Sequence, residues 1–146
     1  MPSPLSIREI TMADAEAAAK LSGELGYPAS TEAMERRIHA RAHLRDHVVL
    51  VASVADQVVA WIDVGIVHHL QAEPYGEIGG IVVADGHRGA GIGSELLARA
   101  ERWIADQGIR TVLVRSQIKR EDAHRFYIRE GYARTKTSAV FSKELA

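Results

Sequence analysis

Cysteine is absent from this chain of 146 residues. Without a thiol, the chain cannot form a disulfide, a thiolate metal site or a covalent cysteine intermediate. Direct transfer from one substrate to another is therefore the simpler route for any group-transfer chemistry that it performs.

The chain also lacks an excess of either positive or negative charge. It has 18 Lys and Arg residues and 19 Asp and Glu residues, which give a formal net charge of −1. Proteins that bind nucleic acids or anionic membranes usually carry a basic excess. No run approaches the roughly 18 consecutive apolar residues of a membrane-spanning helix. The first four residues, Met-Pro-Ser-Pro, lack the basic and apolar regions of a secretory signal. We therefore expect a cytoplasmic protein with a small-molecule partner, and neither a nucleic-acid nor a membrane partner.

Proline and aromatic residues are few, and there is no linker, internal repeat or low-complexity segment. The hydrophobic share of 47% and the charged share of 25% are ordinary for a globular protein. The length suits one compact domain, so residues 1–146 are predicted to form a single domain.

The hydrophobic periodicity predicts an alternation of strands and helices. Helices are expected from Thr11 to Leu25, from about residue 30 to 45, over the apolar face that ends at Gly108, and over 121–130. Strands are expected at 5–10, 47–54, 58–67, 77–84 and 111–115, with one or two more in 132–141. Because this order mixes hairpins with a βαβ crossover, the sequence predicts an α/β fold whose sheet has both parallel and antiparallel pairs.

Residues 77–94, EIGGIVVADGHRGAGIGS, lead from an apolar run through a glycine-rich stretch into a helical pattern. Glycines 89, 91 and 93 can take positive φ angles and allow a ligand to approach the backbone. The first turn of the helix offers unpaired N–H groups, and Arg88 adds a planar donor suited to phosphate oxygens. The stretch therefore predicts a pocket for a phosphorylated ligand.

Two common phosphate-binding motifs do not fit this glycine-rich stretch. A P-loop requires a lysine directly after its last glycine, and none is present. A dinucleotide-binding fingerprint requires Gly-x-Gly-x-x-Gly early in a βαβ unit, whereas this chain has Gly-x-Gly-x-Gly past its middle. A glycine-rich turn without a ligand stays open on the glycines alone.

Two motifs carry a resemblance to a known family. Arg88-x-x-Gly91-x-Gly93 resembles the Gln/Arg-x-x-Gly-x-Gly/Ala motif of the GCN5-related N-acetyltransferases (GNAT). The segment 122–132, DAHRFYIREGY, resembles the second cofactor motif of that family, Ala-x-x-Phe-Tyr-x-x-x-Gly-Phe/Tyr. The resemblance implies a GNAT-like α/β fold, with a mixed parallel and antiparallel central sheet of six to seven strands flanked by about four helices. It also implies acetyl-CoA as the co-substrate.

The resemblance further implies a set of residues that hold acetyl-CoA. They lie on the fourth strand, the glycine-rich loop with its helix, the end of the fifth strand and the last helix: Ile81, Val82, Val83, Arg88, Gly89, Ala90, Gly91, Ile92, Gly93, Ser94, Ser116, Gln117, Ala123 and Phe126. Many relatives carry an asparagine near Gln117, so this chain departs from the family pattern there.

Two catalytic residues follow from the same resemblance. Glu77 lies at the start of the fourth strand, where several relatives have the glutamate that takes a proton from the amine. Tyr127 matches the tyrosine that faces the cofactor sulfur, and it is the candidate general acid for the leaving thiolate. The alternatives are a solvated carboxylate at the start of a strand and an aromatic residue that only packs.

Several other residues have weaker claims. His39, His43 and His47 recur every four residues, but no glutamate follows the first in the His-Glu-x-x-His manner, so no metal is expected. His68 and His69 are either acceptor-side groups or exposed loop residues, and Tyr27 and Pro28 are either acceptor-side residues or a helix end.

These observations together predict an N-acetyltransferase. It would transfer an acetyl group from acetyl-CoA to a primary amine by direct attack in a ternary complex. A small-molecule amine is the favoured acceptor. The alternatives are a protein or peptide N-acetyltransferase and a non-catalytic acyl-CoA-binding sensor module. A homodimer is expected from the resemblance alone.

Overall fold

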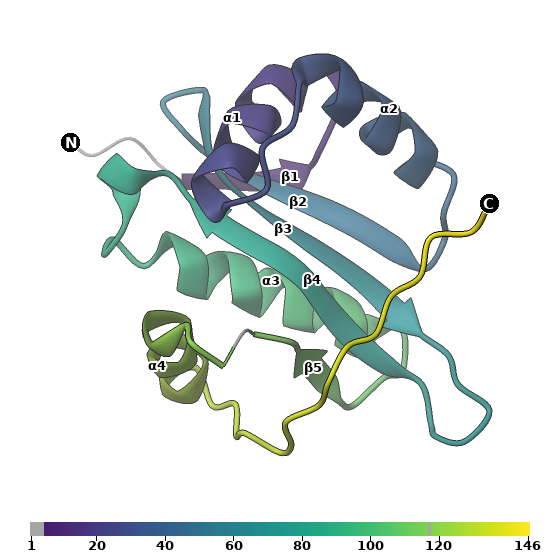
Figure 1. Ribbon diagram of the computed structural model, residues 1–146. Helices are drawn as coiled ribbons and strands as arrows, with labels where there is room; N and C mark the ends of the chain where they lie inside the picture. Colours follow the sequence, from purple (N-terminus) through teal and green to yellow (C-terminus); the bar gives the residue numbers. More distant parts are fainter. Residues whose placement is uncertain (1–4, 117) are drawn as a thin grey trace. The chain divides into compact units, whose positions relative to one another are not determined.

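The computed structural model describes residues 5–116 and 118–146 (Figure 1). The chain divides into two compact units, the first ending at Val114 and the second beginning at Arg115. The first unit contains the whole sheet and three α-helices, and the second contains one α-helix. The prediction of a single domain over residues 1–146 stays a prediction.

A five-stranded sheet forms the centre of the first unit. Its strands follow one another in sequence order: β1 (Leu5–Glu9), β2 (His47–Val54), β3 (Gln57–Val67), β4 (Tyr75–Val83) and β5 (Val112–Val114). The first three neighbouring pairs are antiparallel, and β4 with β5 is parallel. The predicted mixture of parallel and antiparallel pairs is confirmed.

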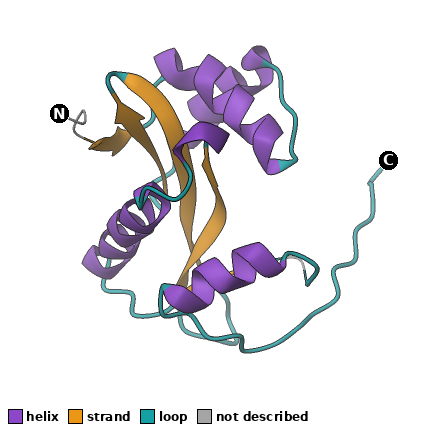
Figure 2. Ribbon diagram, turned by 90° about the vertical axis from the view of Figure 1, so that its left-hand side faces the viewer, coloured by secondary structure: helices purple, strands orange, loops and turns teal. Residues whose placement is uncertain are grey.

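Helices cover both faces of this sheet. Helices α1 (Ala15–Leu25) and α2 (Thr31–Arg41) lie on one face, and α3 (Ile92–Asp106) lies on the other (Figure 2). Trp61 of β3 donates from Nε1 to the carbonyl of Ala18 in α1, which fixes that helix over the first face. A Cβ atom on Gly76 of β4 would strike the side chain of Ile104, so α3 packs closely against the opposite face. Short 3₁₀ turns, Met12–Asp14 and Asp85–His87, precede α1 and α3.

The apolar periodicity of the sequence accounts for the core. In α3 the residues Leu96, Leu97, Ala100 and Ile104 recur at helical spacing, and all four are buried. The strands contribute alternating β-branched residues, among which Val51, Ile62 and Val64 are inaccessible to solvent.

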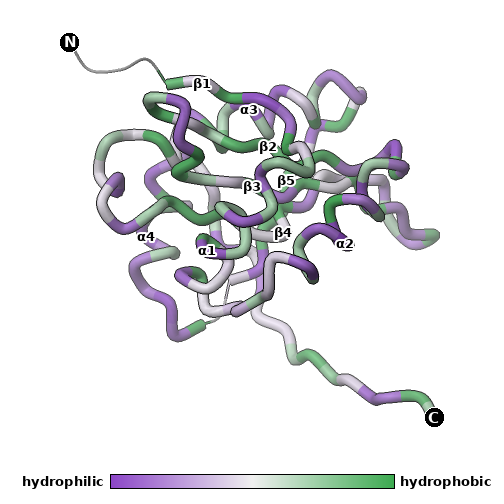
Figure 3. The backbone as a smooth tube through the Cα atoms, turned by 90° about the horizontal axis from the view of Figure 1, so that it is seen from above, coloured by the Kyte–Doolittle hydropathy of each residue, from purple (hydrophilic) through white to green (hydrophobic). Residues whose placement is uncertain are grey.

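The prediction of six to seven strands is wrong, because the sheet has five. The missing strands were expected at 132–141, where the structure has neither helix nor strand. Val140 and Phe141 are 87% and 92% exposed, and Figure 3 shows hydrophobic stretches in this uncovered C-terminal segment. Alternating residues form a stable strand only when a neighbour pairs with the backbone and one face is buried.

The second unit contains α4 (Glu121–Arg129), the fourth of the roughly four expected α-helices. The chain leaves α4 through Gly131, whose φ of +95° is the left-handed conformation that favours glycine after a helix. Among the described residues, no helix of either unit has both the length and the apolar character needed to cross a membrane.

Candidate active site

The outer edge of β4 is paired over only part of its length. In the described chain, β5 pairs with β4 at Gly76, Glu77 and Ile78, and the ladder goes no further. The remaining β4 residues, up to Val83, keep β3 on one side only. Backbone N–H and C=O groups on such an edge can bind an extended, amide-containing ligand.

A β-bulge in β4 lies just after the point where the pairing of β4 with β5 ends. The pairing of β3 with β4 passes from Asp63–Gly80 to Val64–Ile78, which leaves Gly79 as an extra residue on β4. A bulge bends its strand and increases the local twist. The sequence-predicted residues Ile81, Val82 and Val83 follow this bend, with Val82 buried and the other two half-buried. Their apolar side chains serve as the scaffold for the open backbone edge.

The glycine-rich loop follows β4 and has the predicted backbone geometry at two of its three glycines. Gly89 and Gly91 have φ angles of +83° and +82°, and no atom lies within 4 Å of a Cβ built on either. Gly93 differs, because it lies inside α3 and takes no positive φ. Ala90 is exposed, whereas Ile92 is buried in the core, so Ile92 can offer only backbone atoms to a ligand.

Helix α3 begins with its backbone donors directed at this loop. Gly91 is the N-cap and no side chain caps the helix. The first intrahelical hydrogen bond runs from the N–H of Glu95 to the carbonyl of Gly91, 3.1 Å away. The N–H groups of Ile92, Gly93 and Ser94 therefore belong to the first turn, which attracts anions through its N–H groups and dipole.

Arg88 precedes Gly91, the N-cap of α3, by three residues. Its Nε donates to the carbonyl of Val83 at 3.1 Å, and Nη1 lies 3.5 Å from a carboxylate oxygen of Asp85. The side chain is 55% exposed, so its guanidinium can meet a ligand while the loop holds its base. Arg88, the two left-handed glycines and the start of α3 therefore follow one another along the chain, and the binding of a phosphorylated ligand there stays a prediction.

Glu77 lies near the start of β4, within the short stretch of that strand that pairs on both sides. It is opposite Gly65 of β3 and Leu113 of β5, and it is half-buried. The carboxylate therefore lies on the strand whose open edge begins two residues later. Its role as a general base stays a prediction.

In the second unit, Tyr127 of α4 packs with one aromatic residue of the same helix and one that follows it. Its ring lies 5.3 Å from the ring of Phe126 and 5.9 Å from that of Tyr132, both edge to face. Burial raises the pKa of the Tyr127 hydroxyl, against a smaller opposing effect of Arg120. Tyr127 is therefore a protonated donor at neutral pH, as a general acid must be.

The other predicted cofactor residues of this unit are described only in part. Ser116, Ala123 and Phe126 are half-buried, and Arg129 lies 5.6 Å from the centre of the Phe126 ring. Gln117 lies outside the described residues. Contacts of these residues with acetyl-CoA stay predictions.

The weaker candidates are dispersed. Tyr27 is 62% exposed after α1, and its carbonyl accepts a hydrogen bond from Ser22. Nε2 of His68 lies 3.4 Å from Oδ2 of Asp46, whereas Nε2 of His69 lies 3.2 Å from the hydroxyl of Tyr75. The rings of His39 and His43 are 5.4 Å apart on α2. Among the described residues, no three His, Cys, Asp or Glu side chains gather in a way that could hold a metal ion.

One polar pair was missed by the sequence analysis. Asp63 of β3 binds the guanidinium of Arg41 at the end of α2. The available signal was a single aspartate inside an otherwise apolar strand, VVAWIDVGIV, because a carboxylate in such a strand needs a partner.

Comparisons with known proteins agree with this geometry. The family model described as "Acetyltransferase (GNAT) family" matches residues 7–132. An aminoalkylphosphonate N-acetyltransferase of Salmonella typhimurium is 37% identical over 118 residues, which cover 77% of this chain and 71% of that protein.

Solved structures share the fold. The aminoglycoside antibiotic 6'-N-acetyltransferase AAC(6')-IG of Acinetobacter haemolyticus superposes with a TM-score of 0.84 at 21% identity, covering 97% of this chain and 99% of that one. The aminoglycoside N-acetyltransferase AAC(6')-Iy in complex with CoA gives 0.87 at 17% identity, covering 98% and 97%. Because the family model spans most of the chain and the Salmonella relative exceeds 30% identity, this protein is an acyltransferase that belongs to the GNAT acetyltransferase family.

Proposed function

We propose that this protein transfers the acetyl group of acetyl-CoA to a primary amine of a small molecule, by direct attack in a ternary complex. The observation that carries the proposal is the continuity of the open β4 edge with the Arg88 loop and the first turn of α3. An extended thioester that ends in a pyrophosphate needs such an edge followed by such an anion site.

Different residues of the chain bind different parts of acetyl-CoA in this proposal. Backbone groups of Ile81, Val82 and Val83 bind the pantetheine amides, and one N–H polarises the thioester oxygen. The N–H groups of Gly89 to Ser94 and the guanidinium of Arg88 bind the pyrophosphate. Ser116, Gln117, Ala123 and Phe126 are proposed, from the family motif alone, to bind acetyl-CoA as well.

Two side chains handle protons. Glu77 takes a proton from the amine, directly or through water, so that the nitrogen lone pair can attack the thioester carbon. Tyr127 donates a hydrogen bond to the departing thiolate, and its raised pKa supports this role because the hydroxyl keeps its proton. With no cysteine in the chain, no acyl-cysteine step competes with direct attack.

The acceptor is proposed from the relative of 37% identity, whose name is aminoalkylphosphonate N-acetyltransferase. Short aminoalkylphosphonates are therefore the first candidates, ahead of the aminoglycosides named for structural neighbours of 21% and 17% identity. A cytoplasmic location and a homodimer remain predictions.

The test measures thiol release from acetyl-CoA against aminoalkylphosphonates, polyamines, amino acids, aminoglycosides and short peptides. Because the protein has no thiol of its own, a thiol reagent gives no background from it. Turnover with a small amine supports the proposal, and the fastest substrate identifies the acceptor class. Turnover with peptides alone would instead favour a peptide acetyltransferase. Binding of acetyl-CoA without any turnover would favour a sensor module and contradict the proposal.

A further inference from the structure

Polar side chains cluster on the face of the sheet that α1 and α2 cover. Asp63 and Gly65 are two residues apart on β3, so they lie on the same face. Gly65 lies opposite His47 of β2 and Glu77 of β4, and residues directly opposite each other share a face. Asp63, His47 and Glu77 are therefore on one face, together with Arg41, which binds Asp63 from α2.

Glycines leave room around the Asp63 carboxylate. The β4 residues nearest to it across the ladder are Gly79 and Gly80, so no β4 side chain covers it there. A Cβ on Gly79 would lie 3.0 Å from Oδ2 of Asp63, which places that oxygen against the β4 bulge. The side chains of Asp63 and Arg41 are 30% and 32% exposed. The Asp63 carboxylate is therefore partly accessible to solvent and lies beside the β4 bulge, where the open edge of β4 begins.

The charges around Asp63 come from three elements. Burial raises the pKa of the Asp63 carboxyl, Arg41 and His47 oppose this, and Glu77 raises it further. Asp63 and Glu77 are thus close enough for their charges to interact. The buried residues of α1, which packs against β3, bring no charge to this face: Ala15, Ala18, Ala19, Leu21 and Ser22.

The ion pair with Arg41 does not satisfy every polar atom around Asp63. Among the described residues, Nε of Arg41 and Nδ1 of His47 are buried atoms with no hydrogen-bond partner. Arg41 thus binds Asp63 while one of its own buried donors stays without a partner, and His47 is a further group beside Asp63 that is charged only when protonated. A cation that entered beside Asp63 and Glu77 would relieve their mutual repulsion.

We propose that Asp63 binds the ammonium group of the acceptor beside Glu77, and that Arg41 is a positioning residue that holds the Asp63 carboxylate toward β4. This inference rests on the proposed function and adds a residue for recognition of the acceptor. The competing hypothesis is an ion pair that only joins α2 to β3.

The proton count of the step is balanced. The amine enters as an ammonium ion and gives one proton to Glu77, while an N–H that it keeps donates to Asp63. The lone pair then attacks the thioester carbon, the N–C bond forms and the C–S bond breaks. The nitrogen loses a second proton as the amide forms. Of the two protons lost by the nitrogen, one ends on the thiolate of CoA and the other passes from Glu77 to solvent.

The first experiment compares Asp63→Asn with wild type, using a charged amine and a methoxyamine-type nucleophile that is neutral at pH 7. The amide keeps the size of the side chain but cannot form an ion pair with an ammonium group. We expect KM for the charged amine to rise about tenfold or more, since hydrogen bonds to charged groups contribute roughly 1.5–3 kcal/mol. KM for acetyl-CoA and kcat/KM for the neutral nucleophile should change by less than about threefold. Asp56→Asn is the matched control, because Asp56 is an exposed turn residue with a left-handed φ that asparagine also adopts.

The second variant, Arg41→Met, keeps the Asp63 carboxylate and removes its counter-charge. Since Arg41 lowers the pKa of Asp63, its removal should move the acidic limb of the kcat/KM profile for the charged amine to higher pH. A purely structural ion pair would lower the melting temperature without moving this limb. The Arg41→Met profile also decides the matter if Asp63→Asn does not fold.

The failures can be told apart. An active wild type whose amine KM is unchanged in Asp63→Asn, or whose two nucleophiles lose activity equally, would overturn the role of Asp63 alone. A wild type that binds acetyl-CoA and acetylates no amine would overturn both this inference and the proposed function.

Discussion

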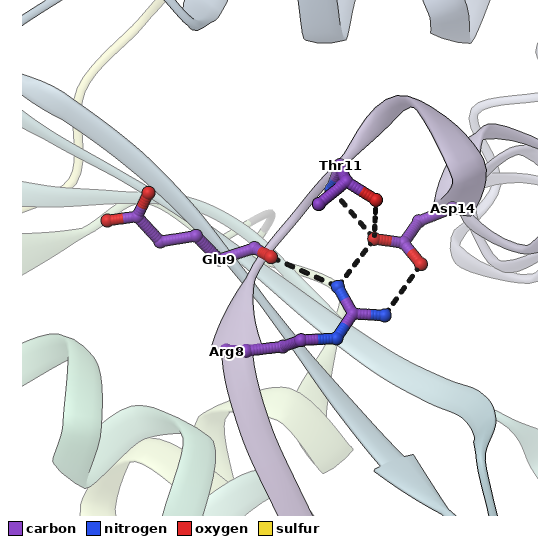
Figure 4. Close-up of polar contacts among 4 residues, drawn as sticks. All are labelled: Arg8, Glu9, Thr11 and Asp14. Carbon is purple, nitrogen blue, oxygen red and sulfur yellow. Dashed lines mark hydrogen bonds and ion pairs between the residues drawn. The ribbon is translucent and has the colours of Figure 1, made fainter.

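The guanidinium of Arg8 binds both carboxylate oxygens of Asp14, with Nη1–Oδ2 and Nη2–Oδ1 distances of 2.8 Å (Figure 4). The Oδ2 atom of Asp14 also accepts from the backbone N–H of Thr11 at 2.7 Å. Asp14 is almost fully buried, so these bonds join the end of β1 to the start of α1. The pair supports the position of α1 on the face of the sheet that also carries Asp63.

Asp14→Asn should lower the free energy of unfolding by about 1–3 kcal/mol at pH 7, because a buried charged acceptor loses its partners. Hydrogen bonding to Arg8, against the cost of burial, lowers the pKa of Asp14. A carboxyl whose folded pKa is depressed stabilises the fold above its unfolded pKa of about 3.9, and this contribution disappears as pH falls through the folded value. Urea unfolding from pH 7 to pH 2 should therefore show a difference from wild type that shrinks below about pH 4. A difference that is constant with pH would contradict this account, and Asp56→Asn should show almost none.

Gly76→Ala should destabilise the fold by about 1–3 kcal/mol through overpacking. The new Cβ would lie 2.7 Å from Cγ1 and Cγ2 of Ile104, a residue with no exposed surface into which it could move. Gly86→Ala is the control, because its Cβ would meet nothing within 4 Å and its φ is not positive. Equal urea midpoints for the two variants would show that α3 can shift away from β4.

The sequence predicted the elements whose periodicity and turn chemistry are local. The apolar spacing of α3 and the left-handed Gly91 before it depend on neighbouring residues, and both are confirmed. The bulge at Gly79 and the choice of Arg41 as the partner of Asp63 depend on contacts between distant segments, so the sequence pattern could not identify either one. The alternation at 132–141 favoured strands, but a strand also requires a partner, which no local pattern specifies.

Gly91→Val should weaken acetyl-CoA binding by more than about tenfold, because the side chain would enter the space proposed for the pyrophosphate. Valine is also strained at the φ of +82°, so the variant needs a control with equal strain. Gly108→Val provides it, since Gly108 has a φ of +81°, lies just beyond α3 and is equally open. Calorimetric titration should find the affinity lost in Gly91→Val and retained in Gly108→Val. Equal affinity in both would place the pyrophosphate elsewhere.

Tyr127→Phe should lower kcat by about 10- to 100-fold and leave KM for acetyl-CoA within about twofold, since only the hydrogen bond to the leaving thiolate is lost. Tyr132→Phe is the matched control, because it likewise removes one phenolic hydroxyl, from the ring that packs against Tyr127. The raised pKa of Tyr127 also predicts that its ionisation causes no loss of activity between pH 7 and about pH 9. An unchanged kcat in Tyr127→Phe would remove this residue from the chemistry.

Glu77→Gln should lower kcat/KM for the amine by about 100-fold or more at pH 7, because general bases typically contribute 10² to 10⁴ in rate. Without the base, the reaction depends on amine that has already lost its proton in solution. The deficit should therefore narrow as the pH rises toward the pKa of the acceptor amine. Glu73→Gln, a change of an exposed carboxylate in the loop before β4, should leave both the rate and its pH dependence unaltered. A Glu77→Gln profile parallel to that of wild type would mean that Glu77 only binds the acceptor, and that water or a histidine takes the proton.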